Sequence, residues 1–593
     1  YNFSSHDSNL PDCPENNFCV LNTLGKQSSG AVSEGNLKAV ITSGGNSGRI
    51  PGTFAVNSGK WYWEVRQSSS NRFGMGVFDV ENYIMTNEDG GVDQYEWVHV
   101  TSDNSGAGQL VNNSNYTNGY GGTAADGHVI MVALDCDNDA IWFGKQGTWY
   151  NTDGSSDSDT VKGQIEGGTT TNAAFTSVTG RLTPSFIRQT SNNTLHVNFG
   201  QDDTFAGNET TAGNTDGNGN GEFQYEPPSG FLALCSSNLP DLAISPAQSS
   251  QADDHFDTVI WTGDGSSPRN IGGLNFKPDW IWDKARDGGT AVSHVLYDSS
   301  RGVKQILSTD QTSLESTLAT GTSAFLDDGF TVNAFSNASG QGRVAWCWKA
   351  NGGTTTTNDA SSTGVGTIDS VFQANDTSGF SIVTYTGTGS AGTVKHGLSV
   401  APSLVIIKSR TTASPSNWVI GQDQTGFGGQ NYFTDISGFG VNSGSFNNTA
   451  PTSSVVSIGT DQTTNGNTAT YVMYCFANVE GFSQIGSYEM NSNVDGPFVH
   501  TGFRPAWLLT RPVDQNGNWA IYDTVREPFN DGDSDMFFAG LNYVESAFAA
   551  SAIDFVSNGF KIRHYSAGYS NIASNTAIYM AFAEQPFKFS NAR

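Results

Sequence analysis

One seven-residue pattern occurs three times in the second half of the chain, and it constrains the fold more than any other feature. Each copy begins with a proline, continues with a mostly apolar run and ends with a basic residue six positions after the proline. The copies are Pro278–Lys284, Pro402–Lys408 and Pro505–Arg511. Their prolines are 124 and 103 residues apart (402 − 278 and 505 − 402). A period near one hundred residues is that of a whole domain, so the sequence predicts three tandem copies of one β-domain.

Further strand-like segments recur around each copy in the same order. One lies upstream of the pattern, one ending in aspartate lies downstream, and an apolar one closes the unit. We therefore expect Phe256–Lys349, Phe380–Ala477 and Phe482–Glu584 to form the same β-sandwich. The upstream segments are Phe256–Gly263, Phe380–Gly387 and Phe482–Tyr488, the downstream ones are His294–Asp298, Trp418–Asp423 and Trp519–Asp523, and the closing ones are Val344–Trp348, Tyr471–Phe476 and Ile578–Phe582.

The positions shared by the three units have structural explanations. The prolines start a strand where a missing N–H does no harm. Cys347 and Cys475 take the same place in two closing segments and Ala581 takes it in the third, so we expect buried, unpaired thiols in a small apolar site. Short helical turns are expected within Gln305–Thr317 and Ala539–Ala552. The basic residues are expected to form half-exposed ion pairs with the aspartates that end the next segments, in the pairs Lys284–Asp298, Lys408–Asp423 and Arg511–Asp523.

The first half of the chain has a different pattern. Residues Trp61–Arg66 alternate in the period-two manner of a strand with one buried face, and short apolar runs follow at Arg72–Phe78 and His128–Asp135. Such runs are typical of an antiparallel sandwich, so the chain is predicted to be all-β and multidomain. The expected divisions are an arm at 1–15, a β-sandwich at 16–235, a linker at 236–254, repeat domains at 255–351, 377–478 and 479–593, and a linker at 352–376 between the first two repeats.

Four segments of this first domain resemble SPRY domains, and they occur in the same order. They are SGKWYWEV at 58–65, FGMGVF at 73–78, HVIMVALDCDNDAIWF at 128–143 and TPSF at 183–186. The resemblance implies a SPRY-like, concanavalin-like antiparallel β-sandwich of a kind that binds proteins or, in wider relatives, sugars. Polar insertions at 101–126 and 151–171 depart from the family where its binding loops would lie, so the resemblance implies no ligand.

The repeats resemble those of large structural proteins of tailed bacteriophages, particularly marine ones. HVLYDSSRG at 294–302 and AWCWKANGG at 345–353 carry this likeness. The combination with a SPRY-like domain is similar to tail-fibre or virion proteins. The resemblance implies a place on a virion, and homotrimers as the default assembly, without implying a chemistry.

Composition excludes several classes of function. The chain has 28 basic and 57 acidic residues, a net charge of −29, which argues against nucleic acid as a partner. No apolar run is long enough to cross a membrane. The six cysteines are too few and too scattered for a disulfide framework, and Cys13–Cys19 is the one plausible local pair.

Motifs for catalysis are missing, and one run is typical of calcium loops. The sequence contains no HExxH, GxSxG, phosphate loop or paired CxxC motif, although a carboxylate pair of the glycosidase type could be hidden among its acidic residues. Asp216, Asn218 and Asn220 follow the pattern D-x-N-x-N-G, and Glu222 is a further candidate ligand. Position twelve is Pro227 instead of the glutamate that such loops need, so a flexible turn is the alternative interpretation.

Tyrosines in polar loops are the candidate binding residues. Tyr116 and Tyr120 lie in NSNYTNGYGG, and His564, Tyr565 and Tyr569 lie in HYSAGYSN. Tyrosine combines an apolar face with a hydroxyl and suits sugar or protein surfaces. The alternative is that these rings cover their own sandwich or an oligomer interface.

The function that follows is a non-enzymatic structural protein of a phage particle, a tail-fibre or appendage component for host adhesion or assembly. Its expected partners are copies of itself, with a homotrimer favoured, other virion proteins, and a host surface glycan or protein. The expected location is the virion, assembled in the host cytoplasm. Two alternatives stay open: an extracellular bacterial adhesin or filament subunit, and a polysaccharide-degrading, tailspike-like enzyme.

Overall fold

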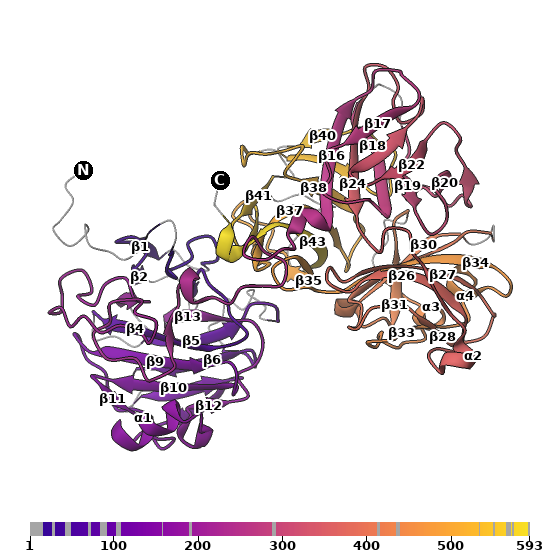
Figure 1. The fold of residues 1–593 in the computed structure, drawn as a ribbon. Helices are drawn as coiled ribbons and strands as arrows, with labels where there is room; N and C mark the ends of the chain where they lie inside the picture. The colour runs from indigo at the N-terminus through magenta and orange to yellow at the C-terminus, as the bar shows by residue number, and fades with distance from the viewer. Residues whose placement is uncertain are drawn as a thin grey trace. The chain divides into compact units, whose positions relative to one another are not determined.

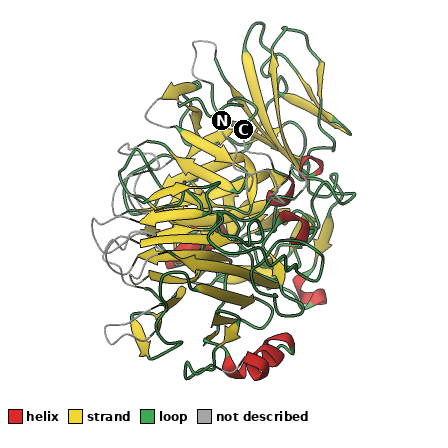
Figure 2. Ribbon diagram, turned by 90° about the vertical axis from the view of Figure 1, so that its left-hand side faces the viewer, coloured by secondary structure: helices red, strands yellow, loops and turns green. Residues whose placement is uncertain are grey.

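Strands and loops make up nearly all of the chain, as Figure 2 shows. No helix among the described residues is long and apolar enough to span a membrane. The predicted all-β, multidomain fold class is therefore confirmed. The computed structural model describes residues 13, 16–26, 30–41, 49–68, 73–82, 92–101, 108–156, 158–188, 193–287, 292–411, 416–434, 439–532, 534–548, 552–564, 571 and 575–590.

The chain forms two compact units, Tyr1–Pro240 and Asp241–Arg593, which follow each other in colour in Figure 1. The first unit is a sandwich of two sheets whose strands are all antiparallel neighbours except for β15, which runs parallel to β4. One sheet contains β1 (Ala31–Ser33), β2 (Lys38–Ile41), β4 (Lys60–Gln67), β9 (Val129–Asp135), β10 (Ala140–Lys145), β11 (Thr148–Trp149), β12 (Phe175–Thr176), β14 (Asn193–Asn198) and β15 (Leu232–Ala233). The other contains β3 (Arg49–Pro51), β5 (Phe73–Asp79), β6 (Glu96–Val100), β7 (Gln109–Asn112), β8 (Asn115–Asn118) and β13 (Leu182–Arg188).

Strand β4 is buried on both faces, although its alternating sequence predicts one buried face. Trp63 lies against Phe199, while Tyr62 belongs to an apolar cluster on the other face. Helix α1 (Ser158–Glu166) and the segment around Phe223 and Phe231 cover that cluster. The polar insertion at 151–171 thus provides a cover for the sheet. The unit also has the short helices η1 (Thr170–Asn172) and η2 (Ser236–Asn238).

The second unit contains the three predicted repeats, and their large sheets share one strand order. In each, the opening strand pairs with the closing strand, the closing strand with the proline-motif strand, and that strand with a fourth. We call Phe256–Lys349 repeat 1, Phe380–Ala477 repeat 2 and Phe482–Glu584 repeat 3. The four strands in that order are β16 (Phe256–Thr262), β24 (Gly342–Trp348), β18 (Trp280–Ala285) and β19 (Val295–Asp298) in repeat 1, β27 (Phe380–Thr386), β34 (Thr470–Phe476), β29 (Leu404–Ser409) and β30 (Trp418–Gln422) in repeat 2, and β35 (Ser483–Glu489), β43 (Thr576–Pro586), β37 (Phe503–Pro512) and β38 (Ala520–Asp523) in repeat 3.

Each repeat adds a smaller sheet, which completes a sandwich. The small sheets are β17 (Arg269–Gly272), β23 (Gly329–Val332) and β22 (Thr322–Leu326), then β28 (Gly392–Lys395) and β33 (Val455–Ile458), then β36 (Phe498–His500), β42 (Gly559–Ile562) and β41 (Ile553–Val556). The remaining elements are η3 (Ala252–Asp254), β20 (Gln305–Ile306), β21 (Ser316–Thr317), β25 (Thr356–Asn358), α2 (Ala360–Thr363), β26 (Ser370–Asn375), η4 (Asp423–Thr425), β31 (Gly429–Tyr432), β32 (Gly440–Val441), α3 (Ser443–Phe446), α4 (Gln462–Asn465), β39 (Ser534–Phe538), β40 (Ser546–Phe548) and η6 (Phe587–Phe589).

The motif strands are apolar on both faces because both faces are covered. Ile281 of β18 and Cys347 of the neighbouring strand β24 face the small sheet of repeat 1. Trp280 and Trp282 face away from it, into a cluster shared with repeats 2 and 3. A strand that is buried on both faces has a nearly continuous apolar sequence, which accounts for the apolar run between the proline and the basic residue of each motif. Cys347 and Cys475 are buried and unpaired, as expected.

The described residues of the two segments that were expected to contain helical turns form strands and loops instead, and residues 549–551 lie outside the described residues. Gln305–Thr317 contains the two-stranded pair β20 and β21, with Ile306 opposite Ser316. Ala539–Ala552 contains β40, which extends the sheet of repeat 3 from β39. In both places, pairing with a strand of the same repeat decides the local structure, because tertiary context overrides weak helical propensity.

Candidate functional site: the junctions between the repeats

The three large sheets meet at a triangle of aromatic rings. Trp348, Phe476 and Phe582 occupy the same place in the three closing strands, opposite the same place in the three motif strands. Their ring centroids lie 6.4 Å (Trp348 to Phe476), 5.7 Å (Trp348 to Phe582) and 6.0 Å (Phe476 to Phe582) apart. Three equivalent positions in mutual contact define a pseudo-threefold axis. The repeats therefore form a closed ring, with a first junction between repeats 1 and 2, a second between 2 and 3, and a third between 3 and 1.

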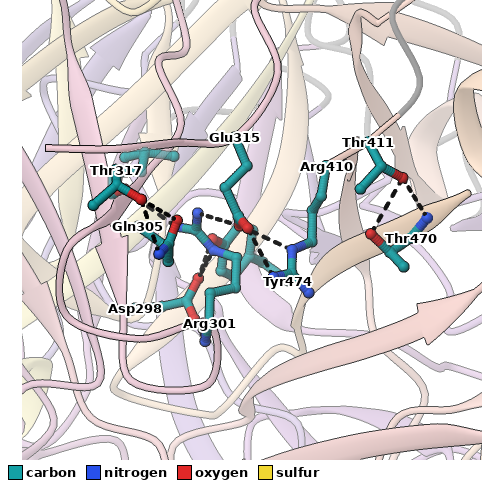
Figure 3. A network of polar contacts seen from close by, with 10 residues as sticks. Asp298, Arg301, Gln305, Glu315, Thr317, Arg410, Thr411, Thr470 and Tyr474 are labelled. Carbon is teal, nitrogen blue, oxygen red and sulfur yellow. Dashed lines mark hydrogen bonds and ion pairs between the residues drawn. The ribbon is translucent and has the colours of Figure 1, made fainter.

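The first junction contains a buried network of charges. Asp298 ends β19 and accepts a hydrogen bond from the Arg301 guanidinium and another from the Tyr474 hydroxyl of repeat 2, at 2.7 Å for the hydroxyl. Glu315 then lies between two arginines, as Figure 3 shows. Arg301 donates to it at 3.1 Å, and Arg410 of repeat 2 donates to both of its oxygens at 2.8 Å. The backbone N–H of Glu315 also donates to the carbonyl of Arg410 at 3.3 Å.

The third junction repeats this network with different residues. Asp523 ends β38 and accepts from the Arg526 guanidinium and from the Trp346 indole N–H of repeat 1, the latter at 2.9 Å. Glu545 accepts from Arg526 at 2.7 Å and from Arg286 of repeat 1 at 2.7 Å. Its backbone N–H donates to the carbonyl of Arg286 at 3.0 Å. Two junctions of the ring thus have the same arrangement of aspartate, arginine, glutamate and arginine, with a tyrosine in one and a tryptophan in the other as the donor to the aspartate.

The second junction fills the same positions with uncharged side chains. Gln422 stands where the other junctions have aspartate, and Met580 stands where they have tyrosine or tryptophan. Phe439 donates its backbone N–H to the carbonyl of Val513 at 2.7 Å, which is the bond made by glutamate and arginine elsewhere. Phe439, Val513 and Met580 all belong to the shared apolar cluster. The chain therefore closes two junctions of the ring with charged side chains and one with uncharged side chains.

Burial determines the properties of the two charged junctions. The side chains of Arg301, Asp298, Arg526 and Asp523 are fully buried. Burial lowers the pKa of an arginine, but the carboxylates beside Arg301 and Arg526 raise it, so both guanidinium groups stay charged. A buried ion pair is costly to break, since the remaining charge has no partner. The networks therefore hold neighbouring repeats in one geometry, and they contain no nucleophile or exposed acid for catalysis.

The predicted ion pairs of the motif are wrong because antiparallel pairing reverses the order. The basic residue lies near the end of each motif strand, opposite the start of the fourth strand. The aspartate lies at the end of the fourth strand, opposite the start of the motif strand. Asp298 is opposite Trp280 and Asp523 is opposite Trp507, about 13 Å along the strand from the basic residue. The pairs concerned are Lys284–Asp298, Lys408–Asp423 and Arg511–Asp523.

The three basic residues are buried and bind backbone carbonyls. Each also lies over an aromatic ring, and the charge-to-centroid distances are 5.7 Å for Lys284 and 5.6 Å for Lys408 and Arg511. Burial lowers the pKa of Lys408 to about 7 and that of Lys284 to about 8. The carbonyls are those of Val292 and Asn542 for Lys284, Ser416 for Lys408 and Tyr432 for Arg511.

The candidate tyrosines of the first unit separate into one exposed and one buried residue. Tyr116 lies on β8 and is 56% exposed. Tyr120 is 1% exposed and its ring contacts His99 and Tyr150, with centroids 5.4 and 5.6 Å away. Tyr120 is therefore a core residue, and the prediction that it binds a ligand is wrong.

The candidate loop of repeat 3 is only partly described. Tyr565 and Tyr569 lie outside the described residues. His564 is 2% exposed, and its Nδ1 lies 3.1 Å from the carbonyl oxygen of Ala552. Burial lowers the pKa of this imidazole. His564 fixes the base of the loop instead of presenting a binding group, which corrects its predicted role.

The calcium-like run is a hydrogen-bonded turn. Asp216 is buried, and one of its oxygens accepts the backbone N–H groups of Asn218 at 2.9 Å and Asn220 at 2.8 Å. Its other oxygen accepts from the backbone of Ala233 at 2.9 Å and from the side chain of Asn238 at 2.7 Å. Both oxygens have hydrogen-bond partners within the protein, which favours the alternative interpretation of a turn, and the calcium site stays a prediction. Glu222 and Asp216 do not belong to a cluster of metal ligands. Within the described ranges, no cluster of three or more His, Cys, Asp or Glu residues could hold a metal ion.

Sequence reasoning missed the arginines and glutamates of the junctions. A signal for them exists, because Asp-x-x-Arg occurs at the end of the fourth strand in repeat 1 (298–301) and in repeat 3 (523–526). A second arginine follows the motif lysine by two positions at Arg286 and Arg410. These spacings become informative only when the hairpin register shows which residues share a face.

Comparison with known proteins gives a family for most of the second unit, and it finds solved structures that are similar to part of the chain. Residues 251–586, more than half of the chain, match the family described as "Domain of unknown function (DUF7483)". The SPRY domain of human HERC1 is similar to 30% of this chain over 96% of its own length, with 18% identity and a TM-score of 0.23. The PSpry domain of TRIM65 is similar to 30% of this chain over 91% of its own length, with 13% identity and a TM-score of 0.23. No curated protein is significantly similar in sequence.

Proposed function

This chain belongs to the family described as Domain of unknown function (DUF7483), and we propose that it is a structural protein of a phage particle, in a tail fibre or similar appendage. Its task there is adhesion to the host or assembly of the appendage. The observation that carries the proposal is the closed ring of three repeats, whose junctions are built for rigidity. Such a ring suits a protein that transmits or resists force more than one that turns over a substrate.

Two features of the ring support a mechanical task. The repeats share one continuous apolar cluster, so that none of them can move without exposing its aromatic face to water. The ion pairs of the two charged junctions oppose the separation of neighbouring repeats, since separation breaks contacts to buried charges. The first unit supplies a separate sandwich, of a fold class used for binding proteins or sugars by the SPRY domains that its sequence resembles. Tyr116 on β8 is the exposed candidate for such contacts.

The homotrimer of typical fibres stays a prediction, and the ring suggests where it applies. One copy of the second unit already carries three related sandwiches around an axis. It can therefore occupy a threefold position of a particle as a single chain or stack with two other copies. Light scattering separates these cases, because a single chain has a mass of 63.0 kDa.

The decisive experiment locates the chain. Particles produced from the genome that encodes it are purified, and mass spectrometry and gold-labelled antibodies then test whether the chain is present and where. We expect labelling on an appendage, together with competition between the purified chain and whole particles for adsorption to host cells. Absence from particles would overturn the virion role. Presence on the bacterial surface would favour the adhesin, and depolymerisation of envelope polysaccharide by the purified chain would favour the enzyme.

A further inference from the structure

Three side chains of the first unit form a chain of polar contacts outside the junctions. Ser68 directly follows β4, and its Oγ lies 2.8 Å from Nδ1 of His196 on β14. The other ring nitrogen, Nε2, lies 3.2 Å from Oε2 of Glu34 in the turn between β1 and β2. The three residues are far apart in sequence, and a hydroxyl, an imidazole and a carboxylate in this order are the arrangement of an activated nucleophile, its base and the group that orients the base.

The sheet itself brings these groups together. Strand β14 lies between β2 and β4, and His196 is opposite Arg66 on one side and Lys38 on the other. Ser68 is two residues beyond Arg66 and therefore lies on the same face. The turn that follows β1 places Glu34 over this face, where Lys38 binds its second oxygen at 2.9 Å. The positions are thus fixed by strand register.

Arg66 adds a cation next to the hydroxyl. Its Nη1 donates to Ser68 Oγ at 2.9 Å, and its Nε donates to Glu209 at 2.8 Å. A guanidinium at this distance stabilises negative charge on the serine oxygen and on the oxyanion of the tetrahedral intermediate, which is two bonds from Oγ. The serine hydrogen is left to point at His196, so that the contacts around Oγ have one consistent arrangement.

The imidazole is in the form that a base needs. Burial is the main cause that lowers the pKa of His196, and the charges of Lys38 and Arg66 lower it further, while Glu34 opposes them. Among the described residues, the charged groups that face the ring are those three, with Glu209 beyond Arg66. His196 is therefore neutral at pH 7 and can accept a proton at Nδ1, while Nε2 lies 3.2 Å from Glu34 without hydrogen-bond geometry in this structure.

We propose that Ser68 is a nucleophile toward carboxylic esters with a short acyl group, with His196 as general base and Glu34 as the residue that positions it. In the first step, Oγ forms a bond to the ester carbonyl carbon and its proton moves to Nδ1 of His196. The carbon–oxygen bond to the alcohol then breaks, and the alcohol leaves with the proton from His196. Water, deprotonated by His196, attacks the acyl-serine, and the acid and Ser68 are released.

A purely structural chain of hydrogen bonds is the competing explanation, and a covalent probe separates the two. The full chain is incubated with an alkyl fluorophosphonate, which phosphonylates an activated serine with loss of fluoride, and the labelled residue is identified by peptide mass spectrometry. Ser155 provides the matched control, because it is exposed and its hydroxyl donates to the carboxylate of Asp153 at 2.6 Å without a histidine. The Ser155→Ala variant should be labelled as fast as the unchanged chain.

The expected result is a single label on Ser68 that is absent in Ser68→Ala and at least a hundredfold slower in His196→Gln. Hydrolysis of 4-nitrophenyl acetate should follow the same order. Glu34→Gln should shift the pH at which the rate rises, which a merely structural contact would not do. Calorimetry of each variant shows that the fold is kept. Labelling of the folded chain that is no faster than that of Ser68→Ala, or a label elsewhere, would overturn the proposal.

Discussion

Removing Glu545 should destabilise the second unit far more than removing an exposed acid. Glu545 bridges Arg526 and Arg286 across the third junction. The variant Glu545→Ala leaves the fully buried guanidinium of Arg526 with one carboxylate instead of two. Because Arg526 keeps Asp523 as a partner, the cost is that of the lost charge-assisted hydrogen bonds, about 2–3 kcal/mol. The same change at the exposed pair of Asp241 with Lys588 should cost about 0–1 kcal/mol, which makes Asp241→Ala the control.

The expected shift in melting temperature follows from the size of the unit. The second unit spans 353 residues (593 − 240). At about 2.1 cal/mol/K per residue, its unfolding entropy is roughly 0.74 kcal/mol/K. A loss of about 2–3 kcal/mol therefore lowers Tm by roughly 3–4 °C, measured by calorimetry on the full chain. A shift below about 1 °C for Glu545→Ala would refute the claim that the network holds the junction closed.

The uncharged second junction supplies the rescue experiment. Replacing a complete buried ion network by apolar residues of suitable shape is often neutral or stabilising. A variant of the third junction that carries the residues of the second should therefore recover most of the Tm lost in Glu545→Ala. A rescue variant that melts as low as Glu545→Ala would show that the two kinds of junction are not equivalent. Its substitutions are Asp523→Gln, Arg526→Thr, Glu545→Phe, Arg286→Val and Trp346→Met.

Three further outcomes are expected. His99 has its pKa lowered by burial from 6.5 to about 3, so its contribution to stability is complete above pH 6.5 and is lost as the pH falls below that value, by about 3 kcal/mol at pH 4.5. His99→Phe should flatten the pH dependence of the first unit's unfolding free energy, and an unchanged pH dependence would contradict this. Lys408→Met should raise the unfolding free energy at pH 7 by about 1–3 kcal/mol, because it keeps the contact with Trp418 and removes a buried charge, and a fall in Tm would contradict this. Cys347 and Cys475 should not react with a thiol reagent such as Ellman's reagent until the chain is unfolded, and reaction in the native state would place them at the surface.

The sequence was sufficient for the repeats because each carries strong local signals. Proline, an apolar run and a closing segment recur in order, and the strand order of the three large sheets follows them. The sites were less predictable, since exposure depends on partners that are distant in sequence. Tyr120 and His564 lie in polar stretches but are buried by neighbouring strands. Asp216 lies in a pattern of calcium loops, but its oxygens are taken by residues up to 22 positions away.

The motif lysines show a second reason why burial could not be predicted from the sequence. From sequence, Lys284 and Lys408 read as strand ends that point to water, because a lysine is seldom fully buried. In the ring, the outer ends of the motif strands are covered by neighbouring segments, and the ammonium groups bind carbonyls there. The closure of three repeats into a ring has no local signature, so the burial of Lys284 against Asn542 of repeat 3 could not be predicted from the sequence.

The distribution of charge among the junctions specifies the order of the repeats. Three related sandwiches could close a ring as 1–2–3 or as 1–3–2, and apolar packing alone discriminates little between the two. In the second order, Glu315 of repeat 1 would face Val513 of repeat 3, and Phe439 of repeat 2 would face Arg286 of repeat 1. The first mismatch would leave Glu315 with Arg301 but without the bidentate pair to Arg410, and the second would remove the carboxylate partner of Arg286, so each would lose a charge pair that the observed order makes.

Only the observed order matches acid to base at two junctions and apolar to apolar at the remaining one. The arrangement thus disfavours the alternative ring by lost charge pairs, in the way that polar groups exclude wrong partners at other interfaces. The uncharged junction is the one between repeats 2 and 3, which directly follow each other in the chain. The third junction, which no peptide bond closes, has a full set of charges.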